Sequence, residues 1–236
     1  MNKTTYSDKL KNLGTETAFA VSIDATEFAQ SGNSVFPFHL GDINISTPKN
    51  IIDETKKAMY DNKNGYVPAN GIPQLRDTIA ETIGFQRGVH YNRENVVVQP
   101  GGKPVIPKFI NTFMNEGDGV LYPNPGYPIY ESQIEYNGGK ALPYRYIHSK
   151  DGFSIDREHF ENMIDKNTKL LVYNNYQNPI GGESTNDEMN WIADIAQKYN
   201  LWVLSDEAYF NIQYSGSPKS IVSLPGMKER TVILYT

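Results

Sequence analysis

The chain has 236 residues, of which 39% are hydrophobic, with a formal net charge of −5 at pH 7, no cysteine and four histidines. This much apolar material suits one large globular domain, or a large domain with a small appendage. The interspersed charges exclude the basic stripe that nucleic acids or anionic lipids attract, and the missing cysteines exclude disulfides and thiolate metal sites, so no metal centre is expected.

The N-terminus is polar over its first ten residues, and no apolar window reaches the length of a membrane span. We therefore expect neither a signal peptide nor a transmembrane helix. Together with the absence of cysteine, this pattern predicts a soluble protein of the reducing cytoplasm.

Helical patterns dominate the first third of the chain. Three stretches carry apolar side chains at helical intervals and are bounded by Gly, Pro or Asn: residues 15–30, 48–61 and 73–84. In the third stretch, apolar side chains four residues apart are expected to form one buried stripe: Leu75, Ile79 and Ile83. No repeat or low-complexity linker separates these stretches. We therefore read residues 1–61 as an N-terminal arm with small-domain material, and residues 62–236 as a large domain.

From Asn95 onward, short β-branched runs alternate with helical patterns. The expected strands are residues 96–98, 119–122, 140–146, 170–173, 201–204 and 231–235. The expected helices follow Pro104 or span residues 127–136, 156–164 and 185–199, with a buried face in the last that includes Tyr199. This alternation predicts an α/β fold with a mainly parallel sheet sandwiched by helices, and ligands in such sheets bind beyond the carboxyl ends of the strands.

Two of the expected strands are followed by groups that can bind an ion. Gly101-Gly102-Lys103 opens a helix, where free N–H groups favour an anion such as phosphate, although the segment alone is more typical of a tight strand-to-helix turn. Asp206 follows the most hydrophobic strand, where a desolvated carboxylate needs a cationic partner. The alternative for Asp206 is an aspartate that caps the next helix.

Two further loops at strand ends carry an amide and an aromatic ring. Asn178 lies in the amide- and glycine-rich segment 174–182, which alone is typical of a turn. Tyr127 lies in a proline-rich loop, where an isolated aromatic ring is typical of a packing plug. Taken together, the four loops offer an anion cradle, a ring, an amide and a carboxylate at one edge of one sheet. A phosphorylated, cationic aromatic ring needs these groups.

With these motifs the chain resembles the class I/II aminotransferases of the pyridoxal phosphate (PLP)-dependent fold type I, which are aspartate aminotransferase-like, from about residue 14 to residue 236. The resemblance implies PLP as cofactor and assigns it eight residues: Gly101, Gly102 and Lys103 at the phosphate, Tyr127 on the ring, Asn178 and Tyr209 at the phenolic oxygen, Asp206 at the ring nitrogen, and Tyr66 at the phosphate of a neighbouring subunit.

The same resemblance implies further roles. Asp206 and Tyr209 are the catalytic candidates in this chain, and Gly41 and Asn178 are expected to line the substrate site. A homodimer with shared active sites is implied, and residues 62–236 become a large PLP-binding domain that is incomplete at its C-terminus. The chain departs from the family at Ile180, where Thr is usual, and at Asn175-Tyr176, where Ser-Pro is usual.

The resemblance places the Schiff-base lysine just beyond the strand 231–235, so we expect the chain to end before it, and also before the arginine that binds the substrate carboxylate. Lys219 and Lys228 are the available substitutes, but both lie in polar loops and are expected to be solvated.

The implied function is transfer of an amino group from an α-amino acid to a 2-oxo acid. One alternative keeps the fold and changes the reaction, as in PLP-dependent β-elimination lyases or synthases. The other alternative is a non-catalytic PLP-binding or dimerising fragment, which the missing lysine would explain.

Overall fold

The chain folds into two compact units in the computed structural model, which describes residues 4–14, 17–38, 41, 45–150, 152–214 and 216–236. Unit 1 consists of Met1–Thr15 and Pro73–Thr236, and unit 2 consists of Glu16–Ile72. Unit 2 holds two helices, α1 (Thr17–Gln30) and α2 (Lys49–Tyr60). Both were predicted, and α2 begins directly after Pro48, whose fixed φ suits the start of a helix.

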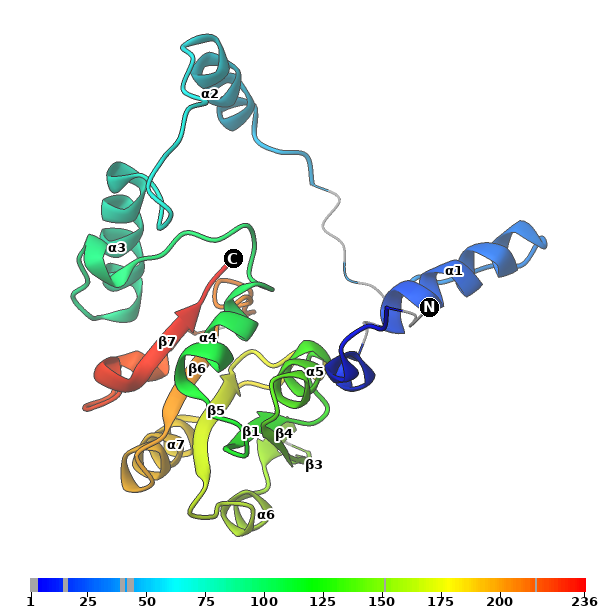
Figure 1. The fold of residues 1–236 in the computed structure, drawn as a ribbon, viewed down its shortest axis with the longest axis vertical. Helices are drawn as coiled ribbons and strands as arrows, with labels where there is room; N and C mark the ends of the chain where they lie inside the picture. Colours follow the sequence, from blue (N-terminus) through cyan, green and yellow to red (C-terminus); the bar gives the residue numbers. More distant parts are fainter. Residues whose placement is uncertain (1–3, 15–16, 39–40, 42–44, 151, 215) are drawn as a thin grey trace. The chain divides into compact units, whose positions relative to one another are not determined.

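Unit 1 is built on a five-stranded sheet in which every pair of neighbours is parallel. Its strand order is β2-β1-β5-β6-β7 (Figure 1). The strands are β1 (Gly119–Pro123), β2 (Lys140–Tyr144), β5 (Thr168–Asn174), β6 (Trp202–Asp206) and β7 (Thr231–Leu234). A separate antiparallel hairpin pairs β3 (Tyr146–Ser149) with β4 (Gly152–Ile155). The predicted mainly parallel sheet is confirmed.

Helices cover both faces of this sheet because successive strand residues point to opposite sides. Leu170 and Val172 pack in one core cluster with α4 (Val105–Phe113) and α5 (Ile129–Tyr136). Leu171 packs in a second cluster with α6 (Arg157–Asn162) and α7 (Asn186–Lys198). The sheet is therefore apolar on both faces, as a buried parallel sheet requires.

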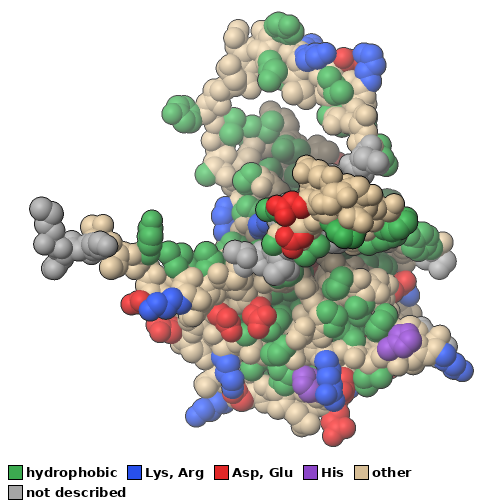
Figure 2. All heavy atoms as spheres, turned by 90° about the vertical axis from the view of Figure 1, so that its right-hand side faces the viewer, with side chains coloured by type: hydrophobic (Ala, Val, Ile, Leu, Met, Phe, Trp, Pro, Cys, Tyr) green, Lys and Arg blue, Asp and Glu red, His purple; other side chains and the backbone are tan. Residues whose placement is uncertain are grey.

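The remaining elements in the described residues of unit 1 are α3 and four short 3₁₀ turns. They are α3 (Pro73–Arg87), η1 (Asp8–Asn12), η2 (Arg93–Asn95), η3 (Ile221–Ser223) and η4 (Lys228–Arg230). Among the described residues no helix is both long and apolar enough to cross a membrane. Figure 2 shows one face of the molecule, on which acidic and basic side chains are interspersed.

Two predicted strands differ from the observed ones. Residues 96–98 are not a strand: they follow η2 without joining either sheet of the described structure. Residues 140–146 are not one strand, because β2 ends at Tyr144 and Tyr146 begins the hairpin. Between them, the Arg145 carbonyl accepts a hydrogen bond from the Asp156 N–H, which turns the chain away from the sheet.

The predicted buried stripe on α3 is wrong. Leu75 is 42% exposed, and the buried positions of this helix are Arg76, Ala80, Gly84 and Arg87. This face is buried because each of its two arginines has polar partners: the Arg76 guanidinium donates to the carbonyls of Arg93 and Val96, at 3.0 and 3.1 Å, and Arg87 pairs with the buried Glu207. Hydrophobic periodicity cannot detect a helix face that is held by buried arginines.

Two smaller differences concern single aromatic residues. Tyr199 caps the C-terminus of α7 and is exposed rather than part of its buried face. Trp202 at the start of β6 is also exposed, and its ring stacks on Phe113 at a centroid distance of 4.2 Å. The other apolar positions expected on α7 are buried: Met189, Ile192 and Ala196.

Gly84→Ala tests the close packing of α3. A Cβ at this position would lie 2.6 Å from the Val89 carbonyl oxygen, so the backbone after the helix must move. We expect the free energy of unfolding to fall by about 1–3 kcal/mol. Thr82→Ala, on the exposed face of the same helix, should change it by less than about 0.5 kcal/mol. Urea denaturation measures both, and equal effects would contradict the packing argument.

Candidate active site

The carboxyl ends of β5, β6 and β7 lie side by side at one edge of the sheet. Asn174 pairs in register with Asp206, and Asp206 pairs with Leu234. The Asn174 side chain joins the strands to the loops: its Nδ2 donates to the Asp206 carbonyl at 2.9 Å, and its Oδ1 accepts from the Asn178 N–H at 2.9 Å. Asn174 thereby fixes Asn178 relative to Asp206.

Asp206 is a buried carboxylate, with 6% of its surface exposed. Its Oδ2 accepts a hydrogen bond from the Tyr130 hydroxyl at 2.6 Å, and its Oδ1 accepts one from the Ala208 N–H at 3.2 Å. Desolvation raises the pKa of Asp206 above its usual range, although both hydrogen bonds oppose this shift. Within the described residues no cation pairs with it, so the carboxylate suits a cationic ligand.

Tyr130 is a site residue that the sequence did not reveal. It lies in α5, is 1% exposed, and contacts Asp206, which is 76 positions away in the sequence. Burial and the nearby Asp206 raise the pKa of Tyr130 well above its usual value, so the phenol remains a donor. The Tyr127 ring packs edge-on against Tyr130, with centroids 5.8 Å apart. Only the three-residue spacing from Tyr127 in a predicted helix could have pointed to it.

The Gly101-Gly102-Lys103 turn lies against the end of β7. Gly101 has a φ of +91°, a conformation that other residues rarely adopt. A Cβ on Gly102 would lie 3.0 Å from a Leu234 methyl and 3.2 Å from the Thr236 methyl. Gly101 is therefore needed for its positive φ, and Gly102 allows the close packing of this turn, which brings the N-terminus of α4 to the edge where Asp206 lies.

Gln177, also missed from the sequence, joins the Asn178 turn to the Tyr127 loop. Its side chain is buried; Nε2 donates to the Pro125 carbonyl at 2.6 Å, and Oε1 accepts from the Ile180 N–H at 3.0 Å. The amide-rich segment after β5 is therefore more than a turn. It holds two of the predicted site loops together.

The other predicted site residues are less closely tied to this edge. Tyr209 lies in the turn after β6 and is 39% exposed, and no hydrogen bond among the described residues joins it to Asn178. Lys103 is exposed at the start of the turn that leads into α4. Gly41 and Tyr66 belong to unit 2, and the neighbours of Gly41 at 42–44 lie outside the described residues. Their assigned roles stay predictions.

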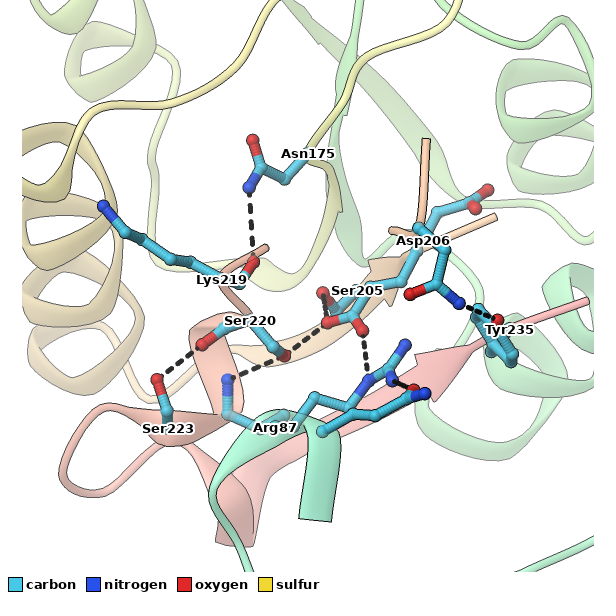
Figure 3. Close-up of polar contacts among 12 residues, drawn as sticks. Arg87, Asn175, Ser205, Asp206, Lys219, Ser220, Ser223 and Tyr235 are labelled. Carbon is cyan, nitrogen blue, oxygen red and sulfur yellow. Dashed lines mark hydrogen bonds and ion pairs between the residues drawn. The ribbon is translucent and has the colours of Figure 1, made fainter. Parts of the chain in front are cut away.

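The two substitute lysines are both exposed, as expected. Lys219 donates to the Asn186 side chain at 2.7 Å, and Figure 3 shows it extended away from Asp206. Lys228 lies over the Tyr91 ring, with its ammonium nitrogen 5.6 Å from the ring centroid. Neither lysine is directed at Asp206.

Comparisons with known proteins agree with this geometry. The chain matches the family described as aminotransferase class I and II over residues 35–236. It is 35% identical over 175 residues to a probable aspartate aminotransferase of Methanocaldococcus jannaschii, covering 74% of this chain and 46% of that protein. It is 28% identical over 230 residues to the aspartate aminotransferase of Bacillus subtilis, covering 96% of this chain and 58% of that protein.

Solved structures show the same architecture. The alanine aminotransferase from Pyrococcus furiosus aligns with a TM-score of 0.86 at 26% identity, covering 93% of this chain and 56% of that one. The aspartate aminotransferase from Thermus thermophilus with maleate aligns with a TM-score of 0.90 at 25% identity, covering 98% of this chain and 60% of that one.

The parallel sheet, its helical layers and these alignments define the fold type I of PLP-dependent aminotransferases. The chain belongs to the class I and II aminotransferase family. It spans between 46% and 60% of the length of the four relatives named above.

Tyr130→Phe tests the hydrogen bond to Asp206. Removing a donor from a buried charged group should lower the free energy of unfolding by about 1.5–3 kcal/mol at pH 7. The matched control is Tyr144→Phe, because the equally buried Tyr144 donates to the Val172 carbonyl, a neutral acceptor, at 3.0 Å. That control should cost only about 0.5–1.5 kcal/mol. Urea denaturation of the cofactor-free chain measures both; equal losses would show that Asp206 is not ionised there.

Asp206→Asn tests the pH dependence of the buried carboxylate. Because its pKa is raised in the folded state, the native chain binds this proton more tightly than the unfolded chain, and stability falls as the pH rises through that interval. Asparagine cannot ionise, so the cofactor-free variant should gain stability relative to the wild type as the pH rises from about 4 to about 7. We expect a gain on the order of 1 kcal/mol at neutral pH, or about 2–4 °C in Tm. If the stability of Asp206→Asn relative to the wild type instead falls as the pH rises, the raised pKa of Asp206 is contradicted.

Proposed function

We propose that this chain forms the PLP-binding part of an aminotransferase that transfers an amino group from an α-amino acid to a 2-oxo acid. The single observation that carries the proposal is the buried Asp206 carboxylate, which has no cationic partner within the described chain. In a member of this family, a protonated pyridine ring is the cation that such a carboxylate fits.

The residues present fit the cofactor at a second point. The Gly101-Gly102 turn packs closely against Leu234 and Thr236, whose methyl groups a Cβ on Gly102 would crowd, and it leads into the nine-residue helix α4. We assign the phosphate to the backbone amides of this turn, because the amino end of a helix favours an anion, with Lys103 beside them. On the same proposal, Tyr127 stacks on the ring, while Asn178 and Tyr209 donate to its phenolic oxygen.

When bound, PLP supplies an electron sink for the carbanion that forms at the substrate α-carbon. The chain's own part is to hold the ring and its proton. Asp206 would keep the proton on the ring nitrogen, and Tyr130 would keep the Oδ2 of Asp206 oriented and ionised. Gln177 and Asn174 would keep the loops of Tyr127 and Asn178 at fixed positions beside it.

Three parts of the proposal concern the whole protein. A homodimer with shared sites is supported by Tyr66, whose side chain is fully exposed in unit 2 and available to a second copy. Gly41 is proposed to line the substrate carboxylate site. The cytoplasmic location rests on composition alone.

The test is PLP binding and amino transfer by the complete encoded protein. We expect an absorption band beyond the protein's own that borohydride fixes to a lysine, and keto-acid-dependent amino transfer from an α-amino acid. Asp206→Asn should lower the transfer rate by at least about a hundredfold. Asp194→Asn, at an exposed position of α7, should leave the rate unchanged.

Absence of a PLP band in the complete protein would contradict the cofactor assignment. Release of pyruvate and ammonia from an amino acid, without keto-acid-dependent transfer, would replace the aminotransferase proposal by an elimination reaction.

A further inference from the structure

In the turn after β6, each of the two cofactor-binding candidates is followed by a buried residue. Asp206 is followed by Glu207, and Tyr209 is followed by Phe210. The Arg87 side chain, from α3, contacts both Glu207 and Phe210. The site described above gives Arg87 no role, so its contacts need a separate explanation.

Arg87 and Glu207 form a fully buried ion pair. The Arg87 Nε lies 2.7 Å from the Glu207 Oε2, and their side chains are 0% and 3% exposed. Dashed lines in Figure 3 mark the contacts that Arg87 makes. The guanidinium is also held between two rings, with its central carbon 3.8 Å from the Phe210 centroid and 4.8 Å from the Tyr235 centroid. These contacts fix the guanidinium plane relative to β6 and β7 together.

The carboxylate oxygen of Glu207 that does not contact Arg87 has hydrogen-bond partners of its own. Its Oε1 accepts hydrogen bonds from the Ser205 hydroxyl at 3.0 Å and from the Ser220 hydroxyl, and its N–H donates to the Leu234 carbonyl at 2.8 Å. Burial raises the pKa of Glu207, and the charge of Arg87 opposes this shift. Both carboxylate oxygens and the N–H of Glu207 are therefore held.

Stability alone does not account for this pair. Replacing a buried ion pair by apolar side chains of similar volume is often neutral or stabilising. Here the Nη2 of Arg87 has no hydrogen-bond partner within the described part of the chain, which makes the pair costlier still. What an apolar replacement would lose is the fixed direction of the turn.

We propose that Arg87 is a positioning residue, which holds Glu207 and Phe210 so that Asp206 and Tyr209 keep their orientation toward the cofactor ring. This inference rests on the proposed function, since it assumes that Asp206 pairs with a ring nitrogen. Neighbouring residues along an extended chain point to opposite sides. Asp206 is directed to Tyr130 of α5, whereas Glu207 is directed to Ser220 and Arg87, so holding Glu207 also fixes the orientation of Asp206.

The test compares binding of PLP with binding of its analogue in which carbon replaces the ring nitrogen. The ratio of the two dissociation constants reports the contact with Asp206 and is insensitive to a general loss of stability. The double variant Arg87→Met with Glu207→Gln removes both charges and leaves no unpaired buried carboxylate. In the complete wild-type protein, we expect PLP to bind at least about tenfold more tightly than the analogue, because tenfold corresponds to one ordinary charged hydrogen bond. In the double variant, we expect this preference to fall below about threefold.

Arg76→Met is the matched control, since Arg76 is a second buried arginine of α3 whose partners, the Arg93 and Val96 carbonyls and the exposed Glu94 carboxylate, all lie away from the turn. It should weaken both ligands equally and keep the ratio. Arg87→Lys is a second variant that keeps the charge beside Glu207 but loses the planar group between the two rings, and it should give an intermediate ratio.

A wild-type ratio that persists in both Arg87 variants would overturn the positioning role and leave the proposed function intact. A wild-type protein without any preference for PLP over the analogue would overturn the pairing of Asp206 with the ring, and the inference with it.

Discussion

The parallel ladder of β5, β6 and β7 is the constraint on which the candidate site depends. Its register places Asn174 beside Asp206 and Asp206 beside Leu234. The loops that follow these strands therefore begin at one edge, and the glycine turn before α4 packs against the same edge through Leu234. A shift by one residue would turn Asp206 from Tyr130 toward the opposite face of the sheet. The register thus decides which groups can act together.

Two adjacent carboxylates at this edge have different partners. Glu207 forms an ion pair with Arg87, whereas Asp206 accepts hydrogen bonds from only two donors among the described residues. Desolvation acts on both, so the difference is one of compensation. A fold optimised for stability alone would not leave a buried charge uncompensated. The uncompensated one marks the place where a ligand is expected to complete the electrostatics.

Much of this arrangement could be predicted from sequence, because β-branched runs and strand-end motifs are local signals. The existence of the five parallel strands and the clustering of Gly102, Asn178 and Asp206 at one edge follow from them, whereas the β3–β4 hairpin was not predicted. Tyr130, Gln177 and Arg87 could not be found, since their partners lie 76, 52 and 120 positions away. The α3 prediction failed for the same reason: its buried face is set by distant partners of arginines and not by its own apolar residues.

The 120-residue separation between Arg87 and Glu207 also bears on how the chain reaches its native state. Arg87 leaves the ribosome long before its partner is synthesised, and a guanidinium cannot be desolvated favourably while it is alone. We therefore expect the C-terminal end of α3 to dock only after β6 has brought Glu207 into place. Because closing so long a loop is slow, we expect consolidation of this helix among the late steps of folding.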